Sequence, residues 1–397
     1  ACTMLEVQAG KIKVPWKLPH LWLISGLFLA VLMSHAVHTY MQGVTDSFEQ
    51  FGKIVLAYLL IVINLTNERR LRIMIILIVA IAVFIAIHCY LQVVQGYGFG
   101  GQVPTITWPG TDLEVIRPRY FGIFHDANDT ALFLVAVIPL CMYLVSLTGF
   151  LGRLLIFCAV VALIVGVCVT QSRGGYVAMA IMLFVFVRRL FSLRYFILAS
   201  IVLFLLLTTI VPQRLTSMGW VERSSIDRVM IWGNANEAFK EQPLFGVGHR
   251  MITDYTEGDR STHNSYVQAY SELGVFGYTF WFALLLISLV GCWRVAGLEA
   301  DTNEESRLIN LADFLIPSLT GLYVGCFFLS RTYNISLYVI LALAAAVYRI
   351  AAAEVGMEKL NFQCAIRRRA IWLYPVSAVG SIIYVYLFII TFNRLNA

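Results

Sequence analysis

The residues best placed to do chemistry are a histidine and an asparagine at the start of an apolar stretch. His263 and Asn264 end a long polar segment, and an apolar run with Glu272, Gly274 and Gly277 follows directly. An imidazole with a pKa near its usual ~6.5 can accept a proton from a hydroxyl group at neutral pH. His263 is therefore our candidate general base, and its structural alternative is a capping or packing role at a helix start.

Two arginines have a setting that favours anion binding. Arg173 lies in the turn sequence Gln-Ser-Arg-Gly-Gly at 171–175, and Arg228 begins an Arg-x-x-x-Trp pattern that ends at Trp232. A guanidinium group stays charged at every physiological pH and binds phosphate through two parallel hydrogen bonds. We expect both side chains to bind a phosphorylated group. The alternatives are a lipid headgroup anchor for Arg173 and an ion pair within the loop for Arg228.

A second set of residues comprises candidate contacts to the substrate. They are Arg250, Arg260, Asn264, Trp232 and His125. His125 and its neighbour Asp126 precede an apolar run, where they can also cap a helix. We expect Glu272 to make a polar contact inside the helix bundle rather than to take part in a reaction.

Metal and nucleotide sites have weak support in this sequence. Asp112-x-Glu114 and Glu257-x-Asp259 are acidic pairs of the kind that can hold a divalent ion, but such pairs also arise by chance in polar loops. The chain has no P-loop, no dinucleotide-binding glycine pattern and no Gly-x-Ser-x-Gly turn. We therefore expect neither a cofactor nor a metal ion.

The composition defines the elements that must position these residues. Hydrophobic residues make up 59% of the 397-residue chain and charged residues only 13%, whereas soluble domains carry about 25% charged residues. Apolar runs of about 20 residues recur, which is the length that crosses ~30 Å of hydrocarbon. The pattern predicts an all-α, polytopic helical membrane protein, because the alternating segments of about ten residues typical of a β-barrel are absent.

We expect about eleven membrane spans within one membrane domain over residues 1–397. The expected spans are 20–37, 53–66, 71–94, 127–147, 153–171, 174–188, 195–211, 265–292, 309–329, 335–349 and 371–392. The second and sixth are short, so we expect them to be tilted, extended by flanking residues, or partly re-entrant. The segments outside the membrane are a Gly/Pro-rich outer loop at 95–126, a large outer loop at 212–264 and a basic cytoplasmic segment at 350–370.

The Lys and Arg content of the short loops alternates from one side of the membrane to the other. A cytoplasmic N-terminus places the basic clusters at 69–72, 188–189 and 367–369 on the inner side, as the positive-inside rule expects. The net charge of +6 then follows from topology, and no nucleic acid partner is required. The cluster at 367–369 can contact anionic membrane lipids.

The large outer loop contains one predicted amphipathic helix at 225–241. Ser224 or Ser225 can cap its start, and the 3.6-residue period places Arg228, Trp232 and Phe239 on one face. A cation beside an apolar stripe is typical of a helix that lies on a bilayer or covers a lipid cavity.

Taken together, these residues resemble the O-antigen ligase and O-antigen polymerase superfamily. The matching motifs are Ser172-Arg173-Gly174, Arg228-x-x-x-Trp232, Pro243-Leu-Phe-Gly-Val-Gly248, and His263-Asn264 followed by Glu272-x-Gly274-x-x-Gly277. The strongest likeness covers 224–277. A large periplasmic loop late in the chain extends it loosely over most of the sequence.

The resemblance implies a GT-C-type glycosyltransferase of the bacterial inner membrane with its active site facing the periplasm. Such proteins transfer a glycan from undecaprenyl diphosphate to a hydroxyl of an acceptor sugar, with inversion and without nucleotide or metal. It further implies that Arg173 and Arg228 bind the lipid diphosphate and that His263 acts on the acceptor hydroxyl. The acceptor is lipid A–core in a ligase, or a second lipid-linked unit in an O-antigen or exopolysaccharide polymerase.

A membrane transporter is the competing class of function. Transporters place ionisable residues and broken helices near the middle of the bilayer, often in repeated halves of the chain. Here the unusual charges gather in outer loops and turns, and no internal repeat is visible. This distribution favours an enzyme over a transporter or a structural scaffold.

Overall fold

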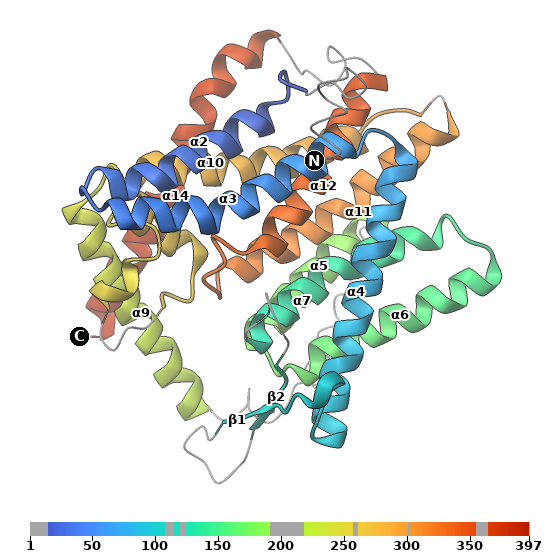
Figure 1. Cartoon of the computed structure of the whole chain (residues 1–397), viewed down its shortest axis with the longest axis horizontal. Helices are drawn as coiled ribbons and strands as arrows, with labels where there is room; N and C mark the ends of the chain where they lie inside the picture. Colours follow the sequence, from blue (N-terminus) through green and yellow to red (C-terminus); the bar gives the residue numbers. More distant parts are fainter. Residues whose placement is uncertain are drawn as a thin grey trace. The chain divides into compact units, whose positions relative to one another are not determined.

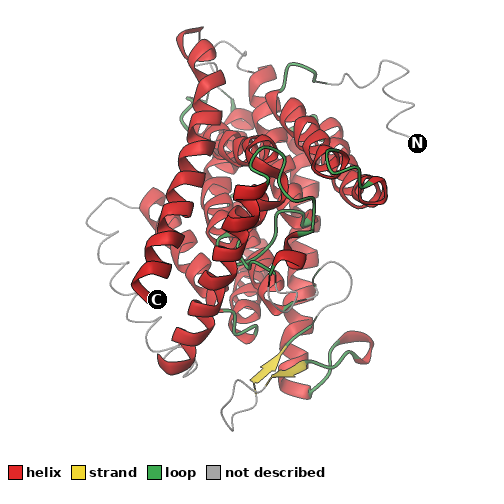
Figure 2. Ribbon diagram, turned by 90° about the vertical axis from the view of Figure 1, so that its left-hand side faces the viewer, coloured by secondary structure: helices red, strands yellow, loops and turns green. Residues whose placement is uncertain are grey.

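A computed structural model describes residues 15–107, 115–119, 124, 126–190, 218–256, 261–300, 302–354 and 364–396. These residues are almost entirely helical, with a single short antiparallel strand pair (Figure 2). Eight of the described helices are long and apolar enough to cross a membrane. The chain is therefore an all-α, polytopic helical membrane protein, as its composition predicts.

The described helices are labelled from the N-terminal to the C-terminal end of the chain. They are α2 (Pro19–Ala36), α3 (Met41–Asn64), α4 (Glu68–Gln95), α5 (Ala127–Val145), α6 (Phe150–Val169), α7 (Arg173–Leu190), α9 (Met218–Glu241), α10 (Ser265–Ala296), α11 (Asn303–Cys326), α12 (Ile335–Glu354) and α14 (Cys364–Asn396). The short elements are β1 (Thr105–Thr107), β2 (Val115–Arg117), and the 3-10 turns η1 (Phe99–Gly101) and η3 (Ile252–Tyr255).

The short second span predicted at 53–66 belongs to a longer helix. α3 begins at Met41 and has 24 residues, which gives it a length of about 36 Å. The predicted span forms the C-terminal part of this helix, which is not among the eight helices that are long and apolar enough to cross a membrane. The span predicted at 195–211 lies outside the described residues.

The chain divides into two compact units. The first comprises Ala1–Leu71, Ser224–Ile309 and Cys326–Ala397. Within it α10 packs against α2, α12 and α14, while α3 packs against α2 and α12 (Figure 1). Small residues allow the α2–α10 approach: a Cβ on Gly277 would lie 3.2 Å from that of Ala30. Close packing at small residues is the usual way in which membrane helices associate.

The second unit comprises Arg72–Arg223 and Asn310–Gly325, and α5 lies at its centre. α6 and α7 both pack against α5, which is buried along most of its length. A Cβ on Gly175 of α7 would lie 2.7 Å from the Cβ of Ala131, so the two helices approach closely at the start of α7. A helix that is apolar all round belongs in such a buried position.

A small hairpin precedes α5 in the outer segment at 95–126. β1 and β2 pair antiparallel with Thr105 opposite Arg117. The sequence predicts only a loop here, because strands of three residues are too short for an alternating pattern to stand out.

Candidate functional site

The membrane helix that follows His263 is broken between two and three turns after its start. Gly274 has φ 62° and ψ −172°, which interrupts the helical backbone of α10. The segment at 243–248, which follows α9, pairs with the backbone on both sides of this break. Val247 N donates to Ser271 O at 3.0 Å and Gly248 N to Glu272 O at 3.1 Å. In return, Val275 N donates to Pro243 O at 2.9 Å and Phe276 N to Leu244 O at 3.1 Å.

Two glycines make this backbone pairing possible. Gly246 has φ 73° and Gly274 has φ 62°, a region that other residues rarely adopt. A Cβ on Gly246 would lie 2.5 Å from Leu273 N, and one on Gly274 would lie 2.5 Å from Phe245 N. The two glycine motifs therefore form one structural unit, which we call the glycine interlock.

Histidines from α2 and its C-terminal turn hold the same segment from the other side. His38 Nε2 donates to the Gly246 carbonyl at 2.9 Å, and His35 Nε2 donates to the His249 carbonyl at 3.1 Å. His249 Nδ1 lies 2.9 Å from Ser47 Oγ. His35 of α2 and His38 of the turn after it therefore bind backbone carbonyls.

His263 lies on a strained turn whose neighbours are firmly anchored. It has φ 48°, which is uncommon for a residue other than glycine and recurs at functional sites. Thr262 O accepts a hydrogen bond from Trp232 Nε1 at 2.6 Å. Asn264 caps α10, since its Oδ1 accepts from Tyr266 N at 2.9 Å and from Val267 N at 3.2 Å.

The segment between α11 and α12 also forms hydrogen bonds with this turn. Ser265 Oγ donates to Leu329 O at 2.6 Å and accepts from Arg331 N at 2.7 Å, and Thr332 Oγ1 donates to Ser265 O at 3.0 Å. Thr262, Asn264 and Ser265 are buried, whereas His263 is partly exposed. The local fold thus presents one imidazole from a turn held on both sides.

α9 carries Arg228 and Trp232 and differs from the predicted helix in two ways. It begins at Met218 rather than at 225, so Ser224 and Ser225 lie inside it and do not cap its start. Its apolar stripe packs against protein rather than lying on a bilayer: Trp232 is 6% exposed, and Asn236 Oδ1 accepts from the Tyr270 hydroxyl of α10 at 2.5 Å. Hydropathy alone does not separate surfaces that face protein from surfaces that face lipid.

Arg228 belongs to the same unit as His263 and is partly exposed. It precedes Trp232 by one helical turn on the same face of α9. Because the Trp232 indole bonds the residue before His263, α9 ties the arginine motif to the histidine turn. The structure therefore brings these two candidate residues to one region of the first unit.

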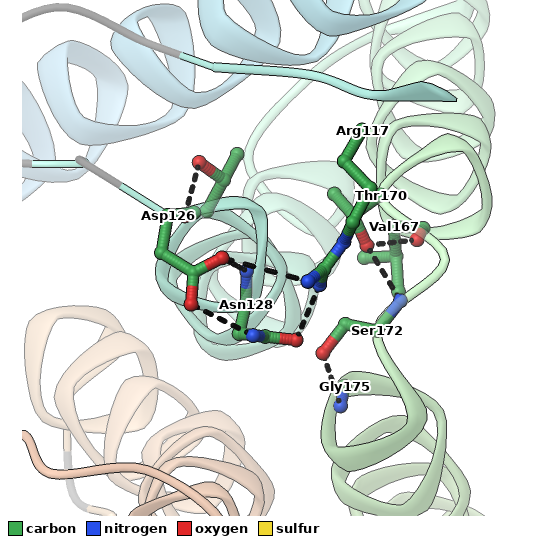
Figure 3. A network of polar contacts seen from close by, with 8 residues as sticks. Arg117, Asp126, Asn128, Val167, Thr170, Ser172 and Gly175 are labelled. Atoms are coloured by element: carbon green, nitrogen blue, oxygen red, sulfur yellow. Dashed lines mark hydrogen bonds and ion pairs between the residues drawn. The ribbon is translucent and has the colours of Figure 1, made fainter. Parts of the chain in front are cut away.

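Arg173 begins α7 in the second unit, in a turn with its own polar network (Figure 3). Thr170 Oγ1 donates to Val167 O at 2.6 Å, and Ser172 Oγ accepts from Gly175 N at 3.1 Å. The Ser172 side chain thus caps the helix that Arg173 opens. Burial, and secondly the like charge of Arg117, lower the pKa of the Arg173 guanidinium.

Buried polar residues lie beside the interlock. Glu272 is fully buried, accepts from Gln268 Nε2 at 3.3 Å and contacts the Arg250 backbone N–H, so it makes polar contacts inside the bundle as predicted. Burial lowers the pKa of His249 to about 3, with smaller contributions from the charges of Arg250 and His35. The Tyr333 ring lies 4.2 Å from that of His249. Burial raises the pKa of the Tyr333 hydroxyl, and the nearby Glu272 charge raises it further.

The remaining predicted site residues are exposed or undescribed. Arg250 is exposed, with φ 63°, and its Nη1 donates to Gln50 Oε1 at 2.5 Å. Arg260 and His125 lie outside the described residues, as do the acidic pairs at 112 and 114 and at 257 and 259. In the described part of the chain, no group of three or more His, Cys, Asp or Glu residues could hold a metal ion.

Sequence reasoning missed two arginines beside the candidate residues. Arg331 belongs to the segment that holds Ser265, and Arg117 lies near Arg173. Both are far in sequence from their neighbours, so no local motif could reveal them. Each of them lies in a segment that the sequence predicts to be a short outer loop, where the positive-inside rule makes arginine uncommon. That was the only sign of them in the sequence.

The fold and the anchored histidine turn define a polytopic helical membrane protein with a candidate site outside its spans. The O-antigen ligase family model matches residues 158–282, a segment that includes Arg173, Arg228, His263 and Glu272. The match supports membership of the O-antigen ligase superfamily, and it indicates a membrane glycosyltransferase-like enzyme that acts on glycans. No curated protein matches the chain.

Proposed function

We propose that this protein transfers a glycan from undecaprenyl diphosphate to a hydroxyl of an acceptor sugar, with lipid A–core as the acceptor. The reaction takes place at the periplasmic face of the bacterial inner membrane, in a GT-C-type enzyme that needs no metal. The observation that carries the proposal is the strained turn that presents His263, which is hydrogen-bonded through Thr262 to the helix that carries Arg228.

The proposed reaction is a direct displacement. The acceptor oxygen attacks the anomeric carbon of the donor glycan and forms the new glycosidic bond with inversion. The bond between that carbon and the diphosphate oxygen breaks, and its electron pair leaves with the lipid diphosphate. His263 takes the proton of the acceptor hydroxyl. General base catalysis of this kind typically contributes about 10²–10⁴-fold.

The arginines serve the leaving group in this proposal. Arg228, which belongs to the same unit as His263, binds the diphosphate oxygens, where its guanidinium group neutralises the charge that grows as the bond breaks. Arg173 remains a proposed diphosphate contact. Arg250, Arg260 and His125 remain proposed substrate contacts. Asn264 and Trp232, which are also candidate substrate contacts, support the turn through the cap of α10 and the bond to Thr262.

The decisive test of the base is a single-turnover assay with purified protein and an undecaprenyl-diphosphate glycan. We expect His263→Ala to abolish transfer while leaving the helical circular dichroism and the elution volume unchanged. Thr253→Ala in the neighbouring turn η3 is the matched control, and it should retain transfer. Near-normal turnover by the His263→Ala protein would remove the base from the mechanism.

A polymerase that joins lipid-linked repeat units is the alternative within the same chemistry, because only the acceptor differs. The assay offers the same donor either with core lipid A or with a second lipid-linked unit. Product formed only with the second acceptor would replace the ligase assignment by the polymerase assignment.

One observation also favours testing the transporter class. Broken membrane helices such as α10 line the substrate sites of many transporters. Here, however, the break at Gly274 is occupied by the paired backbone of the preceding turn, which supports an enzyme. Flux of labelled glycan lipid in proteoliposomes that persists in the His263→Ala protein would favour transport.

A further inference from the structure

A buried carboxylate lies two residues before the break in α10, and the proposed reaction does not use it. The Glu272 side chain is fully buried, and its backbone carbonyl accepts from Gly248 N in the glycine interlock at 3.1 Å. An isolated carboxylate in such a position is costly, so nearby donors or positive charge must stabilise it. Three segments of the first unit supply these contacts.

The first contact leads along α10 to the residue next to His263. Gln268 Nε2 donates to Glu272 Oε1 at 3.3 Å, and Gln268 N donates to Asn264 O at 2.9 Å. Asn264 directly follows His263 and caps the helix. The carboxylate is therefore connected to the histidine turn along one face of the first turns of α10.

The second contact comes from the segment that follows the interlock. The Arg250 backbone N–H contacts the Glu272 carboxylate, and the positive charge of Arg250 is close enough to stabilise it. Arg250 has φ 63°, a conformation that persists for such a residue only where the surrounding contacts hold it. The residue before it is also fixed, since His249 N donates to Ser34 Oγ of α2 at 3.0 Å. The carboxylate thus joins a strained and anchored segment to α10.

The third contact comes from the segment between α11 and α12. The Tyr333 hydroxyl is close enough to the Glu272 carboxylate to stabilise its charge. Neither this hydroxyl nor Glu272 Oε2 has a hydrogen-bond partner of ordinary geometry among the described residues, so the contact is weaker than an ordinary hydrogen bond. Tyr333 directly follows Thr332, whose Oγ1 donates to Ser265 O at 3.0 Å. The carboxylate therefore faces the same segment that holds the residue after the cap.

We propose that Glu272 is a positioning residue for His263, through its contacts with Gln268, the Arg250 backbone and Tyr333. The carboxylate joins the segments that surround the histidine turn and so keeps the imidazole in a fixed place relative to the acceptor hydroxyl. Glu272 touches no substrate in this role. The inference rests on the proposed function for the role of His263 as the base, where a displacement of about 1 Å can lower the rate about 10²-fold.

Glu272→Gln is the principal variant because it preserves the shape of the side chain. An amide has one acceptor oxygen and no charge, so it cannot keep all three contacts. Loss of a buried charge without a change of shape need not lower the overall stability, so the readout is the local order of the histidine turn. We expect backbone amides at 261–268 to exchange hydrogen about 10- to 100-fold faster than in the wild type. Mass spectrometry of the purified full-length protein in detergent measures this exchange.

Two tyrosines of the first unit provide a matched pair of variants. Tyr333→Phe removes the hydroxyl that faces Glu272, and exchange at 261–268 should become about 3- to 10-fold faster. Tyr278→Phe makes the same change at another buried tyrosine, whose hydroxyl lies 2.8 Å from Ser381 Oγ of α14. This control should leave exchange at 261–268 within about twofold of the wild type. Equal exchange in the wild type, Glu272→Gln and Tyr333→Phe would overturn the inference.

The transfer assay separates positioning from a general loss of structure. We expect Glu272→Gln to lower kcat about 10- to 100-fold. The KM for the donor should stay within about twofold of the wild type, because none of the three contacts comes from α9, which carries Arg228. Glu272→Asp restores the charge on a side chain one methylene shorter, and it should recover part of kcat. A loss confined to KM, or an equal loss of kcat in Tyr278→Phe, would overturn the inference.

The two measurements also distinguish this inference from the proposed function. Faster exchange at 261–268 in Glu272→Gln, in a protein that transfers no glycan to either acceptor, would refute the proposed reaction and retain Glu272 as the group that orders the histidine turn. Wild-type exchange and wild-type kcat in Glu272→Gln, in a protein whose transfer depends on His263, would refute the inference and retain the reaction.

Discussion

The glycine interlock gives the sharpest test of how this site is built, through the change Gly246→Ala. Gly246 has φ 73°, and an L-residue in this region is disfavoured by about 1–2 kcal/mol. The added methyl group would lie 2.5 Å from Leu273 N, so the backbone segments at 243–248 and 271–276 must separate.

Separating these two segments breaks buried hydrogen bonds that water does not replace. The nearest are Val247 N to Ser271 O at 3.0 Å and Gly248 N to Glu272 O at 3.1 Å. A buried backbone group left without a partner costs about 1–3 kcal/mol. The backbone strain and the loss of these two hydrogen bonds together should lower the free energy of unfolding by about 3–8 kcal/mol. This is a large fraction of the total stability of a typical folded protein, about 5–15 kcal/mol.

The assay is equilibrium unfolding of the purified protein in detergent, with Gly101→Ala as the matched control. Gly101 has a nearly identical φ of 72°, but a Cβ there would meet nothing within 4 Å. The control should therefore lose only the ~1–2 kcal/mol of backbone strain. The double variant Gly246→Ala/Gly274→Ala should cost about as much as the worse single variant, because both changes open the same interlock. Equal stability of Gly246→Ala and Gly101→Ala would refute the reasoning.

Three further predictions concern the charges of the site. Arg228→Ala should severely reduce donor use and Arg228→Lys should restore only part of it, because lysine keeps the charge without the fork; initial transfer rates at several donor concentrations measure this. Transfer should persist in a chelator, and its loss would indicate Asp112 and Glu114 as ion ligands. His249 has a lowered pKa of about 3, so the unfolded state binds more protons between pH ~6.5 and ~3. Stability should therefore fall as the pH drops through this window, and His249→Gln should flatten the curve measured by unfolding at each pH.

The helical membrane class and the position of the histidine turn were predictable from the sequence, but the interlock was not. Runs of about 20 apolar residues leave few alternatives to membrane helices. By contrast, the pairing of 243–248 with 271–276 is a tertiary contact between two glycine motifs, and neither periodicity nor composition encodes it. The packing of the apolar stripe of α9 against protein was not predictable for a related reason: Trp232 is apolar, yet it hydrogen-bonds to Thr262.

The surroundings of the histidines in the first unit at 35, 38, 249 and 263 also favour His263 as the base. His35 and His38 each donate Nε2–H to a backbone carbonyl, which gives these two rings a structural role. His249 is buried with its pKa lowered to about 3, so it is too weak a base to assist efficiently at neutral pH. His263 is partly exposed, while its neighbours Thr262 and Asn264 are buried and hydrogen-bonded. A base must both reach a substrate and keep a fixed position, and this turn satisfies both requirements through the residues on either side of the imidazole.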